Sequence, residues 1–465
     1  MNRPIHTLAT LRHIETLAGQ AGMPLMDRAA GAIADRVEQR IVRGEPILAL
    51  AGRGNNGGDA LLAAARLAAR GHRVDAWLPL GEPATDDARR AHAQALAAGV
   101  TLVVAPRTAP ALALDGLFGI GLRRAPDAAA SAAIDWLNGI SGHRLALDVP
   151  SGLDAWSGRV TGCAVAATET LTFLADKPGL LTHDGPDQAG EVHLATLDIP
   201  PAWWPAADGA CYQPDDDITH RLARKQNAHK GSFGCVAVLG GATGMTGAAL
   251  LAARAALRTG AGKVRIGLLE PALAVDPLFP ELMLDDAPRA IAHTDVTVVA
   301  IGPGLGQSPA AAQLLRDTLQ RGGPLVLDAD ALNLIAADAG LADLCRTRGA
   351  ATVITPHPAE AARLLGTSTE AVQSDRIAAV RQLASRLNAV ALLKGCGTLV
   401  AGPDGFFTVN PTGHPGLAQA GQGDTLTGMI AALLAQGLSA GQAARHGAWL
   451  HGQTAGSIVA QSTRR

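Results

Sequence analysis

Aromatic side chains are scarce in this sequence, at 3% of its 465 residues, and charged side chains make up only 17%. A chain of this length is too long for one hydrophobic core, so two or three domains are expected. With so few aromatics, those cores must consist mainly of Ala, Leu, Val and Ile. The apolar fraction is 48% and glycine is abundant, at 54 residues. This composition is typical of soluble α/β enzymes with many tight strand-to-helix turns.

A surplus of positive charge is also missing, since the formal net charge is −2. A protein that binds nucleic acid through its phosphates normally carries a basic surplus, so no nucleic-acid partner is expected. One local basic cluster, at 221–230, is interpreted as a solvated segment between domains.

The sequence has no C-x-x-C pair and no long apolar run. Its five cysteines are scattered, which predicts free thiols in a reducing compartment. The first ten residues lack the apolar core of a secretory signal. The longest apolar stretches, such as 429–434, are far below the roughly 20 residues that span a bilayer. We therefore expect a cytoplasmic protein with no membrane partner.

The first half of the chain alternates strand and helix patterns. An apolar run at 46–51 is followed by a Gly-rich segment, a helical stretch at 59–70 and a strand at 74–78, which together predict a βαβ unit and a parallel sheet. Further strands are predicted at 101–104, 111–114, 145–147 and 171–174.

A Pro-rich stretch at 199–205, which we expect to be irregular, interrupts this pattern. We place a domain boundary between about 205 and 220, which gives domains 1–210 and 215–465. The second half then restarts with strands predicted at 235–239, 296–301, 325–327, 352–354 and 390–393, and a helix at 248–257. The predicted fold class is α/β throughout, with Gly-rich loops at strand ends, where such sheets bind ligands.

The loop after the first predicted strand, Gly-Arg-Gly-Asn-Asn-Gly-Gly-Asp at 52–59, has the spacing of a dinucleotide fingerprint, which is a weak signal alone. Asn55, Asn56 and Asp59 add oxygen ligands to the anion-binding N–H groups of a helix start. The alternative is that Asn55 and Asp59 only cap the helix. Capping needs one such residue rather than three, so we favour a ligand site.

Two more carboxylates, Asp115 and Asp148, follow predicted strands. Because the ends of neighbouring parallel strands converge, both are expected to face one crevice. One carboxylate there would hold a hard cation and the other would act as a base. Either residue alone is equally compatible with a simple turn.

The segments Leu-Met-Asp-Arg-Ala-Ala at 25–30, Gly-Asn-Asn-Gly-Gly-Asp at 54–59, Asp-Val-Pro-Ser-Gly-Leu-Asp at 148–154 and Lys-Pro-Gly at 177–179 resemble the NAD(P)H-hydrate epimerase domain. The resemblance covers about residues 1–205 and implies a Rossmann-like three-layer domain that interconverts the R and S hydrates of NADH and NADPH. It also implies a potassium ion near Asn56, Asp115 and Ser151, and proton transfer by Asp148. The implied substrate contacts are Asn55, Asn56, Gly57, Gly58, Asp59, Gly119, Ile120, Gly121, Leu122, Arg123, Arg124, Ala125 and Asp148.

In the second half, Gly-Gln-Gly-Asp at 421–424 precedes a helical run at 425–436. N–H groups at that helix start would stabilise a transferring phosphoryl group, and Asp424 would accept the proton of the attacking hydroxyl. Asp424 is equally suited to be a plain N-cap. A second Gly-rich segment upstream, at 410–416, favours a site.

A Walker A motif is absent, so a nucleotide must be held in another way. The natural candidate is Lys-Gly-Cys-Gly-Thr at 394–398, which follows a predicted strand and contains one of only five lysines in the chain. His357 follows another strand between two prolines, and its spacing leaves a structural and a functional role equally open.

Six segments of this half, at 229–234, 244–248, 302–306, 355–358, 394–398 and 410–424, resemble the ADP- or ATP-dependent NAD(P)H-hydrate dehydratase of the ribokinase-like superfamily. The resemblance implies a ribokinase-like domain that phosphorylates the hydrate's hydroxyl with Mg²⁺ and ADP or ATP and then loses phosphate. The implied substrate contacts are Ala248, Gly304 or Gly306, His357 and Asp424. The implied nucleotide contacts are Lys394, Gly395, Cys396, Gly397, Thr398 and Gly423. Gln422 stands where the family has a smaller residue.

The sequence therefore predicts a bifunctional metabolite-repair enzyme whose epimerase supplies the isomer that the dehydratase uses. Its expected ligands are hydrated NADH or NADPH and ADP or ATP, and the family resemblance suggests a homo-oligomer. The alternative is a small-molecule kinase of the ribokinase superfamily with a non-catalytic N-terminal binding domain.

Overall fold

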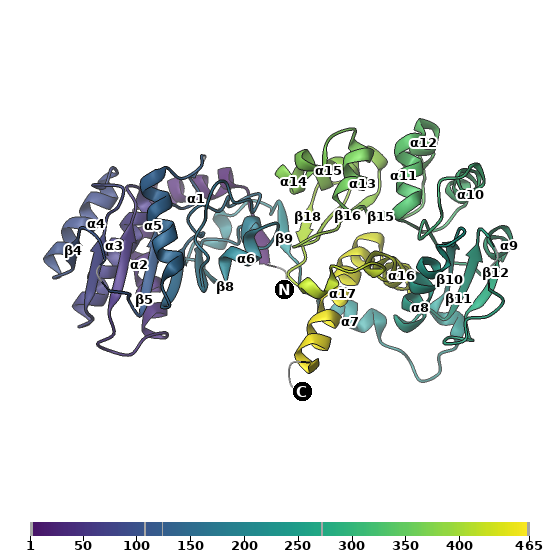
Figure 1. Ribbon diagram of the computed structural model, residues 1–465, viewed down its shortest axis with the longest axis horizontal. Coiled ribbons are helices and arrows are strands. Elements are labelled where there is room, and N and C mark those ends of the chain that lie inside the picture. The colour runs from purple at the N-terminus through teal and green to yellow at the C-terminus, as the bar shows by residue number, and fades with distance from the viewer. Residues whose placement is uncertain (1–2, 107, 123, 271–272, 463–465) are drawn as a thin grey trace. The chain divides into compact units, whose positions relative to one another are not determined.

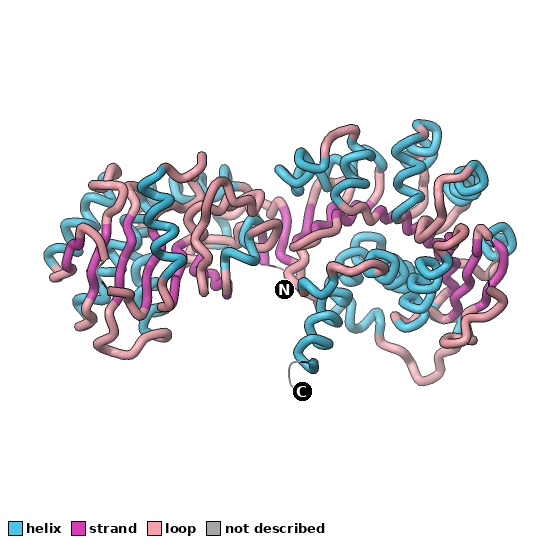
Figure 2. Tube along the Cα trace, in the orientation of Figure 1, coloured by secondary structure: helices cyan, strands magenta, loops and turns pink. Residues whose placement is uncertain are grey.

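The structure is a computed structural model that describes residues 3–106, 108–122, 124–270 and 273–462, with side chains described as far as residue 455. It divides into two compact units, Arg3–Asp208 and Gly209 onward. Each unit carries its own largely parallel sheet with helices on its faces (Figures 1 and 2), which confirms the predicted α/β fold class. Among the described helices, none is long and apolar enough to cross a membrane.

The N-terminal unit is built on a seven-stranded sheet with the order β4-β3-β2-β5-β6-β7-β8. All neighbouring strands are parallel. The chain leaves β2 toward one edge of the sheet and returns to β5 on the other side, so the order reverses between these two strands. In open α/β sheets such a reversal opens a ligand-binding crevice at the carboxyl ends of the strands. The strands are β2 (Ile47–Ala51), β3 (Val74–Trp77), β4 (Thr101–Val103), β5 (Leu112–Gly116), β6 (His143–Leu147), β7 (Glu169–Phe173) and β8 (Glu191–Ala195).

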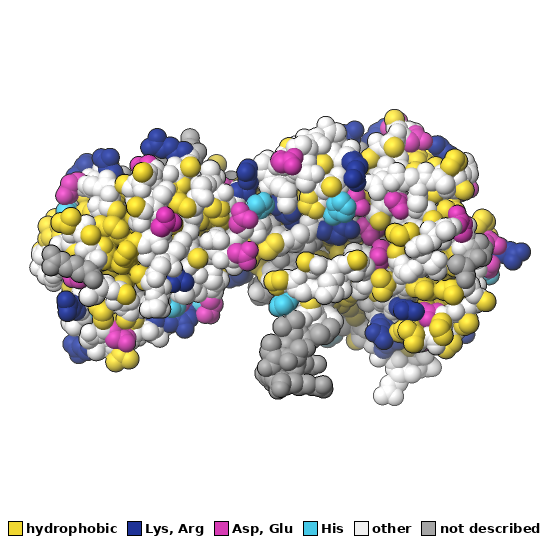
Figure 3. Space-filling model, in the orientation of Figure 1, with side chains coloured by type: hydrophobic (Ala, Val, Ile, Leu, Met, Phe, Trp, Pro, Cys, Tyr) yellow, Lys and Arg dark blue, Asp and Glu magenta, His cyan; other side chains and the backbone are white. Residues whose placement is uncertain are grey.

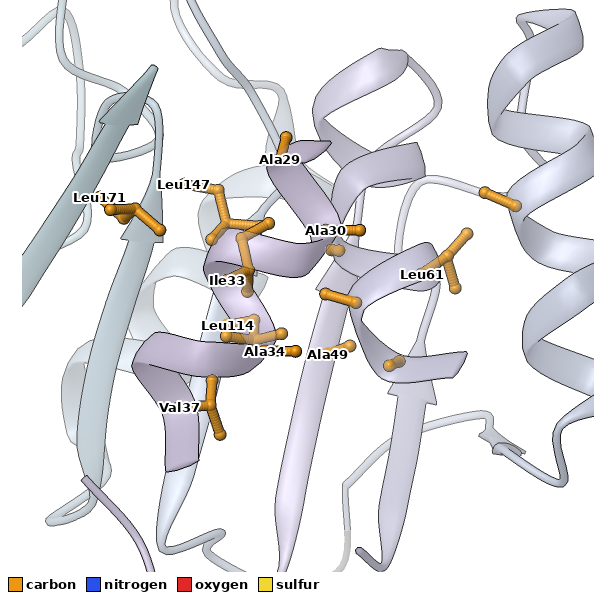
Figure 4. Close-up of a cluster of buried hydrophobic side chains, with 14 of the residues drawn as sticks. Ala29, Ala30, Ile33, Ala34, Val37, Ala49, Leu61, Leu114, Leu147 and Leu171 are labelled. Carbon is orange, nitrogen blue, oxygen red and sulfur yellow. The ribbon is translucent and has the colours of Figure 1, made fainter. Parts of the chain in front are cut away.

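Both faces of this sheet are covered, which is why β2 is buried along its whole length. On one face, Ile33 and Val37 of α2 pack in one hydrophobic cluster with Leu114 and Leu147 (Figure 4). The other face packs against Ile134 of α5 and its neighbours. The remaining elements are β1 (Arg3–Ile5), α1 (Leu8–Gln20), α2 (Leu25–Glu38), α3 (Asn55–Ala69), α4 (Asp86–Ala97), α5 (Ala128–Gly139), η1 (Pro178–Leu180), α6 (Gly185–Ala189) and η2 (Pro201–Trp203).

Within the C-terminal unit the strands follow the order β9-β18-β17-β16-β15-β14-β13-β10-β11-β12. Only β17 among them runs antiparallel to its neighbours. The order reverses between β10 and β13, which places a second crevice at their carboxyl ends. The strands are β9 (Gly209–Cys211), β10 (Cys235–Gly240), β11 (Lys263–Leu268), β12 (Met283–Asp286), β13 (Val298–Ile301), β14 (Leu325–Leu327), β15 (Thr352–Ile354), β16 (Val390–Leu393), β17 (Leu399–Ala401) and β18 (Phe407–Val409).

Two helices, α8 and α16, pack closely over the centre of this sheet. A Cβ atom added at Gly428 of α16 would lie 1.9 Å from the carbonyl oxygen of Ala252 in α8, so only glycine permits this approach. The helices of the unit are α7 (Asp216–Leu222), η3 (Lys230–Phe233), α8 (Thr246–Arg258), α9 (Ala287–Ala292), α10 (Pro309–Gln320), α11 (Ala329–Ala337), α12 (Ala339–Arg346), α13 (Pro358–Leu365), α14 (Thr369–Ser374), α15 (Arg376–Leu387), η4 (Pro415–Leu417), α16 (Gln422–Ala435) and α17 (Ala440–Ser462).

Four local predictions were wrong. Helices α3 and α16 begin at Asn55 and Gln422, earlier than the predicted 59 and 425, so the residues assigned to loops lie in the first helical turns. Asp115 lies inside β5 rather than after it. The Pro-rich stretch contains a short 3₁₀ turn, η2.

On the face shown in Figure 3, acidic and basic side chains are interspersed over both units.

Candidate active sites

A cavity of about 1440 Å³ lies at the carboxyl ends of β2, β5 and β6 in the N-terminal unit. Most of the predicted substrate residues line it: Asn55, Asn56, Asp59, Gly119, Ile120, Gly121, Leu122, Arg124, Ala125 and Asp148. Gly57 and Gly58 are buried in α3 behind this lining. Arg123 lies outside the described residues.

The first turn of α3 faces this cavity without a side-chain cap. Its N-cap is Gly54, and neither Asn55 nor Asp59 caps the helix. The Oδ1 atom of Asn55 instead accepts a hydrogen bond from the Thr85 hydroxyl at 2.7 Å. The Nδ2 atom of Asn56 donates to the carbonyl oxygen of Phe118 at 2.8 Å. The backbone N–H groups at the start of α3 are therefore not capped by a side chain. Uncapped N–H groups at a helix start are suited to binding anions.

Asp115 and Ser151 form a buried oxygen-rich cluster beside Asn56. Both residues are fully buried. Asp115 Oδ1 accepts from the Ser151 hydroxyl at 2.6 Å, and Asp115 Oδ2 accepts from the Ser151 N–H at 2.8 Å. Burial raises the pKa of Asp115 to about 6, although the hydrogen bonds from Ser151 and Leu117 oppose the shift. The three residues predicted to hold a cation thus lie at one place.

Asp148 follows β6 in a left-handed backbone conformation, with φ of 68°. Its Oδ1 atom accepts a hydrogen bond from Lys177 Nζ at 2.5 Å, and Lys177 is almost fully buried. Lys177 belongs to the Lys-Pro-Gly motif at 177–179, which by itself predicts no role for this side chain. The rarity of lysine in this chain was the signal that could have identified it.

Glu15 and Asp59 are among the other carboxyl groups that line the same cavity. Glu15 of α1 was not predicted by any sequence signal. Burial raises the pKa of Glu15, and the nearby Asp148 raises it further. Burial also raises the pKa of Asp59 well above its usual range, with added contributions from Asp148, Glu15 and Asp87.

In the C-terminal unit, Asp424 lies in the first turn of α16, whose N-cap is Gly421 with φ of 86°. Asp424 does not cap the helix. Burial raises the pKa of Asp424 to about 6; Asp328 raises it and Lys394 lowers it. This carboxyl group is therefore ionised above about pH 6 and available as a base.

Lys394 and the fully buried Asp328 form an ion pair beside Asp424. Lys394 Nζ lies 2.8 Å from Asp328 Oδ1, and the Thr427 hydroxyl donates to Asp328 Oδ2 at 2.8 Å. Burial lowers the pKa of Lys394, but Asp328 and Glu360 raise it, and the net shift is upward. A Cβ atom at Gly423 would lie 3.2 Å from Lys394 Nζ, so the structure brings together Gly423, Asp424 and Lys394. Asp328, which binds both Lys394 and Thr427, was not predicted from the sequence.

The rest of the loop that is predicted to bind the nucleotide also follows β16. Gly395 has φ of 137°, and a Cβ atom there would lie 2.7 Å from the guanidinium of the buried Arg376. The Thr398 hydroxyl donates to the carbonyl oxygen of Gly395 at 3.0 Å, which closes the loop. Cys396 is exposed at its tip, and Gly397 has φ of 59°.

Substrate residues predicted on two other loops lie close together. A Cβ atom at Gly304 would lie 3.2 Å from the Cβ atom of Ala248 in α8. The Gly306 N–H donates to Asp330 Oδ2 at 2.8 Å, which fixes the end of the same loop.

His357 has a structural role that its spacing had left open. It is the N-cap of α13, where its Nδ1 accepts from the N–H groups of Ala359 and Glu360 at 3.1 and 3.4 Å. Glu360 in return accepts from the His357 N–H at 2.8 Å. The His357 side chain is 47% exposed, and its Nε2 atom lies 3.3 Å from Glu360 Oε1.

Gln422, which the sequence did not explain, contacts the last helix. Its Oε1 atom lies 3.1 Å from His451 Nε2 of α17. The side chain thus links the start of α16 to α17.

Comparison with known proteins assigns both halves of the chain. Residues 22–179 match the family described as YjeF-related protein N-terminus, and residues 236–464 match the family described as NAD(P)H-hydrate dehydratase. A protein of Coxiella burnetii named bifunctional NAD(P)H-hydrate repair enzyme Nnr is 37% identical over 98% of this chain and 95% of its own length. This chain belongs to the bifunctional NAD(P)H-hydrate repair enzyme family.

Two further relatives cover nearly the whole chain and about half of it, respectively. A protein of the same name from Moorella thermoacetica is 35% identical over 99% of this chain and 93% of its own length. The protein named ADP-dependent (S)-NAD(P)H-hydrate dehydratase from Neisseria meningitidis is 49% identical over 51% of this chain and 81% of its own length.

Proposed function

We propose that the N-terminal unit interconverts the R and S hydrates of NADH and NADPH, and that the C-terminal unit dehydrates the S form at the expense of ADP or ATP. The observation that carries the proposal is that one chain, similar over nearly its full length to repair enzymes, places a carboxyl group beside a lysine at each of two sheet crevices. These pairs are Asp148 with Lys177 and Asp424 with Lys394.

The dehydration needs phosphorylation because hydroxide is a poor leaving group and phosphate is a good one. The hydroxyl oxygen of the hydrate bonds to the terminal phosphorus of the nucleotide while the bond from that phosphorus to the nucleotide breaks, and the hydroxyl proton passes to Asp424. Phosphate then leaves with the electrons of the C–O bond, and loss of a ring proton restores the double bond. Lys394 and the N–H groups at the start of α16 stabilise the negative charge.

Mg²⁺ would neutralise charge on the nucleotide phosphates. The described residues contain no group of three or more His, Cys, Asp or Glu arranged to hold a metal ion.

The cluster of Asn56, Asp115 and Ser151 fits a potassium ion. Its donors are oxygen atoms, and among the described residues no cationic side chain opposes the buried charge of Asp115. A hard cation would supply that missing charge and stabilise the loop between β5 and α5.

Two predictions stay as the sequence left them, namely a homo-oligomer and a cytoplasmic location. The kinase alternative with a non-catalytic N-terminal domain is not supported, because the similarity extends over both halves of named repair enzymes.

The proposal is tested by the fate of the transferred phosphate. Purified protein is incubated with hydrated NADH, Mg²⁺ and ADP or ATP, and inorganic phosphate and phosphorylated product are measured together. We expect one inorganic phosphate for each NADH formed. Accumulation of a stable phosphorylated product would instead indicate the kinase alternative.

A further inference from the structure

Inversion of the hydrate requires two proton-transferring groups. Hydration of an enamine places the hydroxyl on the carbon bonded to the ring nitrogen, so the nitrogen lone pair can expel that hydroxyl once it is protonated. Water must then add to the opposite face of the ring and lose a proton there. One side chain must therefore hold a proton while another is ionised.

The described carboxyl groups that line the N-terminal cavity can be sorted by their partners. Asp27 is ion-paired with Arg66, and Asp87 is ion-paired with Arg90. Asp127 caps α5 through a hydrogen bond from the Ala130 N–H at 2.9 Å. Asp148 is ion-paired with Lys177. The two that remain have no hydrogen bond or ion pair with any described residue, and they are Glu15 and Asp59.

These two carboxyl groups differ in their charged surroundings. Glu15 lies near the cations Lys177 and Arg12, which oppose the rise of its pKa. Asp59 is subject only to raising influences, which are burial and the charges of Asp148, Glu15 and Asp87. The other cationic side chains of the cavity, Arg53, Arg90 and Arg124, do not offset this shift. Asp59 is also the less solvent-exposed of the two, because it is half-buried whereas Glu15 is exposed, so Asp59 is the better placed to hold a proton.

We propose that Asp59 is the general acid of the epimerisation, acting on one face of the hydrated ring while Asp148 acts as base on the other, and that Glu15 is a positioning residue that acts on the ring through Asp59. The inference rests on the proposed epimerase function and adds roles that the motifs do not assign. Asp59 comes from α3, Asp148 from the end of β6 and Glu15 from α1, so three separate elements present them to one cavity.

The step is balanced without any further reactant. Asp59 protonates the leaving hydroxyl, the C–O bond breaks, and the ring nitrogen forms a double bond to the same carbon. A water molecule attacks that carbon from the other face, the C=N π electrons return to nitrogen, and Asp148 takes the proton. The carboxylates around the cavity stabilise the cationic intermediate. In the reverse reaction the two residues exchange roles.

The test uses the full-length protein without nucleotide, so that only epimerisation proceeds, and separates the two hydrate diastereomers chromatographically. For Asp59→Asn we expect kcat to fall about 100- to 10000-fold with little change in KM, because an amide cannot transfer the proton. A raised KM with wild-type kcat would reduce Asp59 to a binding residue and overturn the proposal. In ¹⁸O-labelled water each inversion should introduce one solvent oxygen, and retention of the original oxygen would also overturn it.

The role of Glu15 is tested by the pH profile. Glu15→Gln removes one of the negative charges that raise the pKa of Asp59, so the alkaline fall in kcat should move to lower pH. An unchanged alkaline limb would refute this role. Asp127→Asn is the matched control, since it removes a cavity carboxylate but keeps a residue that caps helices well, and its profile should not move.

Two results separate the possible failures. Dehydration of the S hydrate by the Asp59→Asn protein shows that the variant is folded. Absence of inversion by the wild-type protein would refute the proposed epimerase function itself, and with it the role of Asp59.

Discussion

Asp424 is the proposed base of the dehydration, and its environment should set the pH at which it works. Burial and the neighbouring Asp328 raise its pKa to about 6, while Lys394 opposes the shift. A base must be ionised, so we expect the dehydration rate to fall as the pH drops through about 6. The measurement is kcat for NADH recovery from the S hydrate between pH 5 and 8. A rate that is constant down to pH 5 would contradict the role of Asp424 as base.

At the level of residues, the sequence predicted the polar groups that belong to recognisable motifs. It did not predict the carboxyl groups that lie beside those residues in the structure. Asp148 and Asp424 stand in such motifs, whereas Asp328 and Glu15 do not. Asp328 reaches Lys394 only because β14 and β16 lie on either side of β15, a proximity that no sequence spacing encodes. Glu15 similarly depends on how α1 packs near the end of β6.

Helices α3 and α16 show why local propensity misplaced the element boundaries. Glycine disfavours a helix by about 1 kcal/mol relative to alanine, so Gly57, Gly58 and Gly423 argued for loops. The structure nevertheless places them in first helical turns, and glycine is needed there because neighbouring atoms come close to each Cα. A Cβ atom at Gly57 would lie 2.0 Å from the carbonyl oxygen of Gly52. The strands at 325–327, 352–354 and 390–393 were predicted correctly, since they are short apolar runs buried on both faces.

The contact between α8 and α16 gives a prediction at the scale of elements. Gly428→Ala would place a Cβ atom 1.9 Å from the backbone of Ala252, so the helices must separate. We expect a loss of about 1–3 kcal/mol in stability and a large loss of dehydration, because α8 and α16 both contribute to the site. Thermal unfolding and NADH recovery are the measurements.

The control for that substitution is Gly349→Ala, in the same unit. No atom lies within 4 Å of a Cβ atom at Gly349, and stability and dehydration should remain near wild type. If Gly428→Ala left Tm and activity unchanged, the close packing of α8 on α16 would not be needed to form the site.

For the whole molecule, the two sites lie in separate compact units. We therefore expect two defective proteins to complement each other when mixed. Asp148→Asn should recover NADH mainly from the S hydrate, and Asp424→Asn should recover none. A mixture should clear both isomers, because the free hydrate can diffuse from one site to the other. If the mixture recovered no more than Asp148→Asn alone, transfer of the hydrate within one molecule would be required.

The central claim is that one chain converts both hydrates back to the reduced cofactor. It is tested most directly by adding the wild-type protein to a mixture of R- and S-hydrated NADH with Mg²⁺ and ADP or ATP, and following NADH absorbance to completion. We predict recovery of all the hydrated cofactor. Recovery of only the share present as the S isomer would contradict the epimerase function, and no recovery with either nucleotide would contradict the dehydratase function.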